Sequence, residues 1–307
     1  MLETLLTTII VFPLLALIFL LSKSQRAHIL RYLAAWANTT KAGADSGSYY
    51  DHVLPHGPLV QHYANLWTVT GTLPTTSFFP PRTMLLYRLP STTAVLVHSP
   101  ICVRDDVADA IDALGQIRYI LIPNRAHRLD CEHWARRYPS ATVLAPSFAR
   151  DSVREYVPDG EVAICEQEMA EFEAEAAPGD LPGVYYMPVG YEQFELAYVM
   201  RLQGAESPES VVIVVADTFF NLREAPLLVK ALGSADGFRL GKYGLITARD
   251  PHAVLEWLLD LCYAAWAMDV EAVFMAHGEP VQGRGQVVLE LKRAADRLTR
   301  DMGLYYT

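Results

Sequence analysis

A small set of polar side chains follows directly after the strands that the sequence predicts. Each of these strands is a short apolar run, and ligands of layered α/β folds bind beyond the carboxyl ends of strands, where loops and helix N-termini converge. Histidine and carboxylate side chains in such a position are ligands that suit zinc. The set consists of Asn124 and His127 after residues 119–122, Asp217 after residues 211–216, and His277 after residues 272–275.

Two kinds of chemistry follow from these residue types. His127, Asp217 and His277 suffice to hold one metal ion and to leave an open position for water, whose pKa such an ion lowers toward ~7. Asp217 would then belong to the catalytic centre, and Asn124 would donate its amide to a developing oxyanion. Each residue also has a structural alternative, since Asn124 and Asp217 can cap the segments that follow them and His127 can be an ordinary surface histidine.

Composition and motif searches exclude several classes of function. The 307 residues are 51% hydrophobic and 20% charged, with a net charge of −10. Nucleic-acid binding needs clustered Lys and Arg, so no nucleic-acid partner is expected. The chain has no G-x-S-x-G elbow, no phosphate loop and no HExxH motif. Its 4 cysteines are scattered without a CxxC pair, which favours free thiols.

The elements that must position the candidate residues alternate between strands and helices, which predicts an α/β layered fold. Three β-prone runs come first, at residues 66–70, 83–89 and 93–98. Further strands are expected at residues 119–122, 142–145, 211–216 and 272–275. Helices are expected at residues 104–114, 130–138, 253–267 and 287–302.

The order of these motifs resembles that of the metallo-β-lactamase superfamily. Shared features are an early β-meander, a strand running into a His-containing turn, a later strand running into Asp-Thr, and a last strand running into His-Gly. One branch of the superfamily, in which the first motif reads Pro-Asn-x-x-His, is especially similar. The resemblance covers about residues 60–300 and implies an αββα sandwich, two sheets face to face with helices outside. It is carried by Pro123-Asn124, His127, Trp134, Tyr138-Pro139, Asp217-Thr218 and the run from Ala276 to Val281.

The departures from the family pattern imply a reduced metal site. In the superfamily the motif H-x-H-x-D-H helps to seat two zinc ions, whereas the corresponding positions here are Asn124, Ala126, Arg128 and Leu129. His127 and Asp130 fit only if one residue is inserted. The middle histidine has no counterpart in the run Met187-Pro188-Val189-Gly190. Asp217 matches the bridging carboxylate and His277 the last ligand, so the resemblance implies one zinc ion, with His127 as third ligand, or no metal.

Two functions therefore remain open, besides a polar cluster that only stabilises the fold and binds no ligand. The first is a hydrolase that acts on a small-molecule substrate with a single metal ion, and it rests on Asp217 and His277. The second is a non-catalytic domain that binds a ligand or a protein through the altered pocket, and it rests on the missing His-rich motif. In the hydrolase hypothesis, Arg125 or Arg128 would attract an anionic substrate.

Four further polar residues lie near the motifs. His98 ends a predicted strand and is expected to line the site at most. Asp130 and Asn221 are candidates for supporting the ligands from behind. His133 comes six residues after His127 on a predicted helix, so it is expected to point away from the site and to face solvent.

The N-terminal segment predicts a membrane anchor. Residues 4–22 carry no charge and are mostly Leu, Ile, Val and Phe, and ~20 apolar residues suffice to span a bilayer as a helix. A cleaved signal peptide is disfavoured because there is no basic residue before this run and no A-x-A pattern after it. We expect an anchor at residues 1–22, a juxtamembrane helix and linker at residues 23–58, and the domain at residues 59–307.

Flanking charge predicts the orientation of that anchor. Lys23, Arg26, Arg31 and Lys41 follow the apolar run, with no acidic residue before Asp45. The positive-inside rule then places the large domain on the cytosolic side of a single-pass protein. The glycosylation sequon that starts at Asn38 favours the opposite orientation.

Overall fold

The computed structural model describes most of the chain after its N-terminal segment. Among the described residues, no helix is both long enough and apolar enough to cross a bilayer. The predicted anchor at residues 1–22 and the following residues 23–48 lie outside the described part. The described ranges are residues 49–72, 80–90, 92–157, 161–166, 184–188, 195–203, 210–224, 237–241 and 250–305.

The first sheet has seven strands in the order β1-β2-β3-β4-β5-β6-β7. Strands β1 to β4 form an antiparallel meander, and β4 to β7 are parallel neighbours. Helices therefore have to cross over between the parallel strands. The strands are Val60–Tyr63, Leu66–Gly71, Arg82–Arg88, Ala94–His98, Gln116–Leu121, Thr142–Ala145 and Val162–Ile164.

The second sheet has five strands in the order β15-β13-β10-β9-β8, and a small third sheet has the order β12-β11-β14. In the second sheet only β10 and β13 are parallel neighbours. The second sheet consists of Val184–Pro188 (β8), Leu196–Arg201 (β9), Val211–Val214 (β10), Ala272–Phe274 (β13) and Val281–Gln282 (β15). The third consists of Phe219–Leu222 (β11), Gly237–Leu240 (β12) and His277–Gly278 (β14).

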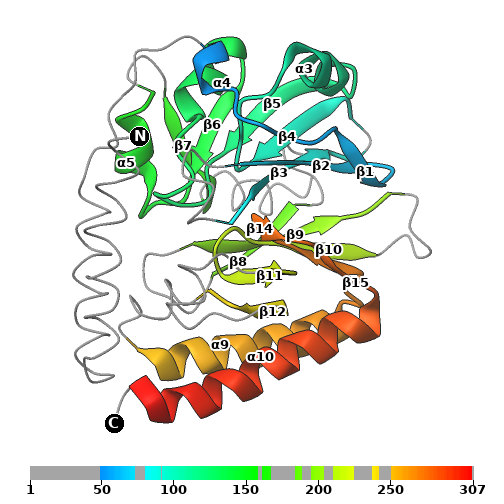
Figure 1. Ribbon diagram of the computed structural model, residues 1–307, viewed down its shortest axis with the longest axis vertical. Coiled ribbons are helices and arrows are strands. Elements are labelled where there is room, and N and C mark those ends of the chain that lie inside the picture. The colour runs from blue at the N-terminus through cyan, green and yellow to red at the C-terminus, as the bar shows by residue number, and fades with distance from the viewer. Residues whose placement is uncertain are drawn as a thin grey trace.

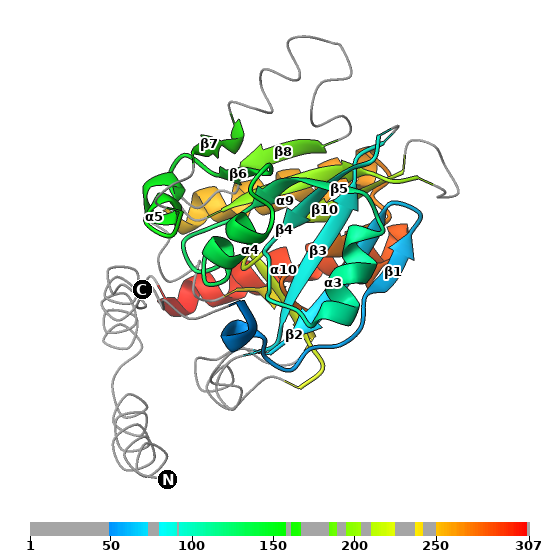
Figure 2. The same ribbon diagram turned by 90° about the horizontal axis from the view of Figure 1, so that it is seen from above.

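The two large sheets lie face to face between two layers of helices (Figure 1). Figure 2, seen from above, has α3, α4 and α5 in front of the first sheet and α9 and α10 behind the second. Three apolar cores correspond to this layering: one between the sheets, one under α3 to α5, and one under α9 and α10. The helices are α3 (Asp105–Asp112), α4 (Cys131–Arg137), α5 (Arg150–Arg154), α9 (Pro251–Ala267) and α10 (Arg284–Tyr305).

Alternation along β10 shows why these residues form a central strand. Val212 and Val214 pack into the core between the sheets, whereas Ile213 packs into the core under α9 and α10. A strand that is covered on both faces has to be apolar at every position, and β-branched residues suit it. The run Val-Val-Ile-Val satisfies both requirements and ends three residues before Asp217.

The expected α/β class and the αββα layering are confirmed by these sheets, helices and cores. Strands such as β9, β11 and β12 were not expected, because their short runs of four to six residues carry no distinct period. All four cysteines are free thiols, as expected.

Residues 49–58, which fall within the expected linker, contact the domain. They contain the 3-10 helix η1 (Tyr49–His52). The Tyr49 hydroxyl accepts a hydrogen bond from the Val103 N–H at 3.0 Å, and His56 Nε2 accepts one from the Arg104 N–H at 2.9 Å. This part of the segment is therefore held against the first sheet and α3.

Candidate metal centre

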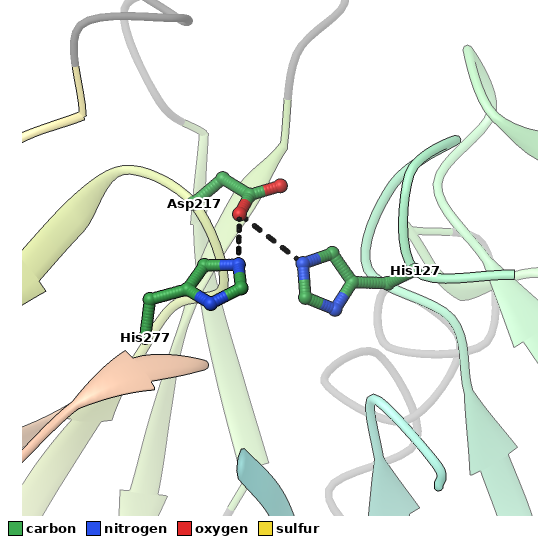
Figure 3. Close-up of side chains that lie close together, drawn as sticks. All are labelled: His127, Asp217 and His277. Carbon is green, nitrogen blue, oxygen red and sulfur yellow. Dashed lines mark ion pairs between the residues drawn. The ribbon is translucent and has the colours of Figure 1, made fainter. Parts of the chain in front are cut away.

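Three loops from different parts of the chain bring His127, Asp217 and His277 together. His127 lies in the turn between β5 and α4, Asp217 follows β10, and His277 begins β14 after β13. Their ligand atoms all lie within 4.8 Å of one another, and all three residues are buried. Figure 3 shows both imidazoles directed at the carboxylate of Asp217. The three predicted metal ligands therefore form one cluster at the edge shared by the two halves of the sandwich.

One carboxylate oxygen is shared between the two imidazoles. Asp217 Oδ1 lies 3.0 Å from Nε2 of His277 and 3.2 Å from Nε2 of His127. The three side chains are no more than 11% exposed, so solvent screens these interactions little. Two ring nitrogens and one carboxylate oxygen thus converge on a common point.

A backbone carbonyl sets the protonation of the His277 ring. Nδ1 of His277 donates to the carbonyl of Pro81 at 2.9 Å, so the neutral ring carries its lone pair on Nε2, the atom that faces Asp217. Two acceptor atoms at hydrogen-bond distance need a cation between or beside them, either a proton or a metal ion. Histidine ligands of metal sites are commonly oriented in this way by a carbonyl on the other nitrogen.

Ser99 holds the second ring from the other side. Its hydroxyl lies 2.5 Å from Nδ1 of His127, and its backbone has φ 56°. A non-glycine residue with positive φ is uncommon, and such strain gathers at functional sites. Ser99 follows directly after β4, so the end of the strand that carries His98 also contributes a serine contact to His127.

The turn that carries His127 is held by Asn124. Asn124 Oδ1 accepts hydrogen bonds from the backbone N–H groups of Ala126 at 2.8 Å and His127 at 3.2 Å. Asn124 Nδ2 donates to Asp217 Oδ2 at 2.9 Å and lies 3.3 Å from Glu195 Oε2. Helix α4 begins later, with Asp130 at its N-cap, so the structural alternative for Asn124 applies to the turn rather than to the helix.

The oxyanion role of Asn124 stays a prediction. Its amide nitrogen already contacts two carboxylates, so a substrate oxygen would have to replace one of them. A carboxylate acceptor makes a stronger hydrogen bond than a neutral carbonyl does. The arrangement favours a role for Asn124 in joining His127 to Asp217.

The pKa values of Asp217 and His277 are both shifted from their usual values. Burial alone would raise the pKa of Asp217, but the adjacent His127 and His277 rings outweigh it and hold that pKa well below its usual value. Burial would lower the pKa of His277, and its bond to Asp217 outweighs this and raises it. The metal-free pair is thus arranged as carboxylate and imidazolium, with a proton in the place that a metal ion would take.

Burial is the main cause of the pKa shifts of two neighbouring side chains, His98 and Glu195. His98 is 1% exposed, and burial together with the charge of His127 lowers its pKa to about 3. Burial and the nearby Asp217 carboxylate raise the pKa of Glu195 to about 7. His98 is therefore a neutral side chain beside the cluster, and it is not one of the three residues whose ligand atoms converge, which agrees with a lining role.

The remaining candidates hold the frame of the site. Asp130 is 1% exposed, pairs with Arg82 and accepts from the Cys102 N–H at 3.1 Å. Asn221 donates to the Glu279 carbonyl at 2.8 Å, and β11 pairs with β14 at Phe220 and His277. These contacts fix the strands that carry the ligands.

Arg125 and Arg128 both contact the segment around α5. Arg125 donates to the Phe148 carbonyl at 2.8 Å. The Arg128 guanidinium lies 4.8 Å from the centre of the Tyr156 ring. Their predicted role in attracting an anionic substrate stays a prediction.

The expectation that His133 faces solvent is wrong. His133 is 4% exposed, and its ring lies 3.9 Å from that of His52, centroid to centroid. His52 belongs to η1, in the segment that was expected to be a linker. Helix periodicity could not reveal this contact, so it wrongly predicted that His133 is exposed to solvent.

The middle histidine of the family pattern was sought in the run 187–190. The last two residues of that run lie outside the described part of the chain.

Solved structures that are similar to this chain include three metallo-β-lactamases. One is the mono-zinc form of FIM-1 from Pseudomonas aeruginosa, with 11% identity, a TM-score of 0.48, and coverage of 80% of this chain and 97% of that one. The enzyme from Erythrobacter litoralis with β-mercaptoethanol in its active site has 12% identity, a TM-score of 0.46, and coverage of 78% and 96%. The enzyme from Hirschia baltica has 14% identity, a TM-score of 0.43, and coverage of 79% and 98%.

The identities between this chain and these metallo-β-lactamases are thus 11–14%. No family model matches the sequence, and no curated protein does. Any activity of this domain therefore depends on the chemistry of its own residues.

Proposed function

We propose that the chain is a metal-dependent hydrolase that uses a single zinc ion held by His127, Asp217 and His277. The observation that carries the proposal is the His277 ring, whose Nδ1 donates to the Pro81 carbonyl while its Nε2 faces Asp217 Oδ1 at 3.0 Å. This places a lone pair beside a carboxylate in a buried site, which is the donor pattern of a zinc ligand set.

The residues of the site fit the ion in number and type. Two imidazoles and one carboxylate are three protein ligands, which matches a catalytic zinc site with one position left open. When bound at such a site, zinc supplies Lewis acidity, which polarises an acyl or phosphoryl oxygen and acidifies water. Asp217 balances one of its two charges, and Ser99 and Pro81 hold the rings.

The substrate is proposed to be a small molecule with a hydrolysable acyl or phosphoryl bond. Chromogenic esters, thioesters and phosphodiesters can be offered to the purified full chain with zinc and after chelation. We expect turnover of one class that requires zinc and falls at least 100-fold in His277→Gln, since the ring is a ligand. His133→Gln is the matched control, because His133 is an equally buried histidine of α4 outside the cluster.

A second candidate function is favoured by the altered motif. Ala126, Arg128 and Leu129 stand where the resemblance implies ligands, so a domain that binds a ligand or protein without catalysis is the alternative. The same measurement separates the two functions, because the alternative predicts no zinc-dependent turnover of any class.

We further propose that residues 4–22 anchor the chain in a membrane, with the domain on the cytosolic side. The support is the uncharged apolar run and the basic residues that follow it. The full chain should stay in the membrane fraction after an alkaline wash, and a chain without residues 1–22 should be released. Release of the full chain would contradict the anchor.

A further inference from the structure

A buried carboxylate that does not belong to the ligand set lies directly behind Asp217. Glu195 is 1% exposed and precedes β9. In the antiparallel pairing of β9 with β10, Tyr198 is opposite Val214, and continuing that register brings Glu195 level with Asp217. Beyond the last backbone pair of β9 and β10, the side chain of Glu195 accepts the hydrogen bond from the Asp217 N–H.

Both oxygens of Glu195 accept hydrogen bonds from the loop that carries the ligand. Oε2 accepts from the backbone N–H of Asp217 at 2.8 Å. Oε1 accepts from the backbone N–H of Thr218 at 2.6 Å and also from the Thr218 hydroxyl. The carboxylate thus takes the place of the next carbonyl of the ladder and fixes two successive peptide groups.

Asn124 connects this carboxylate to the side chain of Asp217. The Asn124 amide nitrogen lies 2.9 Å from Asp217 Oδ2 and 3.3 Å from Glu195 Oε2. With Oδ2 held by Asn124, the other oxygen, Oδ1, is the one that faces the two imidazoles. The orientation of the ligand carboxylate is therefore determined from behind.

The buried Glu195 carboxylate needs all of these hydrogen-bond donors. A buried carboxylate is costly unless hydrogen bonds satisfy it, and bonds from N–H groups to a carboxylate are stronger than those between neutral groups. These bonds span from Asn124 to Thr218, so they connect the two halves of the sandwich at the ligand.

We propose that Glu195 is a positioning residue of the metal centre, which holds the backbone of Asp217 and, through Asn124, presents Asp217 Oδ1 to the ion. This role rests on the proposed function, because it concerns the same ion. Glu195 is not one of the three candidate ligands, and its hydrogen bonds reach the site through Asp217, Thr218 and Asn124.

Glu195→Gln tests the role with little change of shape. One end of the amide must carry NH₂, and it then faces either the N–H groups of Asp217 and Asn124 or the donors of Thr218. Loss of an outer partner of a metal ligand lowers affinity by about 10- to 100-fold. The measurement is the zinc dissociation constant of the full chain, by competition with a chromophoric chelator, together with the visible absorption of the Co²⁺-loaded protein.

Asn65→Asp is the matched control. Asn65 is 0% exposed and lies at the far end of β9, where its amide donates to the Arg201 carbonyl at 3.1 Å and its oxygen accepts from the Gln203 N–H at 2.8 Å. The substitution likewise exchanges an amide and an acid in a buried hydrogen-bonded site. Because the sites are distant, zinc affinity should stay within roughly twofold of the parent.

The expected result is weaker zinc binding and an altered Co²⁺ spectrum in Glu195→Gln, with both unchanged in Asn65→Asp at a comparable loss of stability. Parent affinity in Glu195→Gln, or equal losses in both variants, would overturn the role while leaving the proposed function intact. If Glu195→Gln does not fold, Thr218→Val removes one donor and should weaken zinc binding about 2- to 10-fold, and unchanged binding would overturn the role. A parent that takes up no zinc would overturn the proposed function and this role with it.

Discussion

His277 and Asp217 face each other with Nε2 and Oδ1 3.0 Å apart, while the other ring nitrogen of His277 is committed to a backbone carbonyl. The space between and beside these two atoms accepts a proton or a metal ion. Their arrangement therefore connects the stability of the metal-free protein to pH and, under the proposed function, its activity to zinc.

The metal-free protein should lose the stabilisation from this pair at alkaline pH. The folded-state pKa of His277 is raised above 6.5, so its contribution is fully present below 6.5 and is lost as pH rises through the folded-state pKa. Denaturant unfolding in a chelator, from pH 6 to about 9, should show the difference between parent and His277→Gln shrinking. The exposed His252 on α9 gives the control variant His252→Gln, and a difference that stays constant would contradict the ion pair.

His98 should make the protein less stable in acid. It is buried with its pKa lowered to about 3, so the unfolded chain takes up a proton at higher pH than the folded one does. Stability is then lost as pH falls below 6.5, by up to ~1.4 kcal/mol per pH unit. His98→Gln should flatten the dependence of the unfolding free energy on pH between about 4 and 6. An unchanged slope would show that His98 is protonated in the folded state.

Gly278, which directly follows His277, should not tolerate substitution by a residue with a Cβ. Its φ is +112°, and a Cβ there would lie 2.1 Å from the Asn221 carbonyl oxygen. Gly278→Ala should therefore cost at least ~1–3 kcal/mol of unfolding free energy and weaken zinc binding, because it displaces His277. Gly285, in the first turn of α10, has nothing within 4 Å, so Gly285→Ala should stabilise by ~0.4–1 kcal/mol. Equal effects at both positions, measured by denaturant unfolding, would contradict this account.

Asp130 should matter for stability and not for metal content. It forms a buried pair with Arg82, the side chains being 1% and 6% exposed, and removing one partner of such a pair costs ~3–5 kcal/mol. Asp130→Asn should lower the unfolding free energy strongly while zinc content is kept. Glu132, which pairs with the exposed Arg136 along α4, provides the control Glu132→Gln with a loss below ~0.5 kcal/mol. Loss of zinc in Asp130→Asn would contradict this separation and show that the Arg82–Asp130 pair also holds the metal centre.

The clustering of His127, Asp217 and His277 could be predicted from the sequence because each residue follows an apolar run that forms a buried strand. The run before Asp217 is covered on both faces, and the His-Gly pair at residues 277–278 is explained by the close approach of Asn221 to Gly278. Local pattern and resemblance agree at these positions.

Glu195 and Ser99 could not be predicted, because their roles depend on partners far along the chain. Glu195 reaches Asn124 over 71 residues, and Ser99 reaches His127 over 28. Neither residue belongs to a motif. The wrong expectation for His133 has the same origin, since its cover, His52, comes from a segment that reads as a linker.

The zinc content of the purified full chain, measured by elemental analysis in the parent and in His127→Gln, Asp217→Ala and His277→Gln, tests the central claim most directly. The account predicts one zinc per parent chain, loss of zinc in all three variants, and retention in the control His133→Gln. A parent without zinc, or variants that keep it, would contradict a single-ion site at these residues.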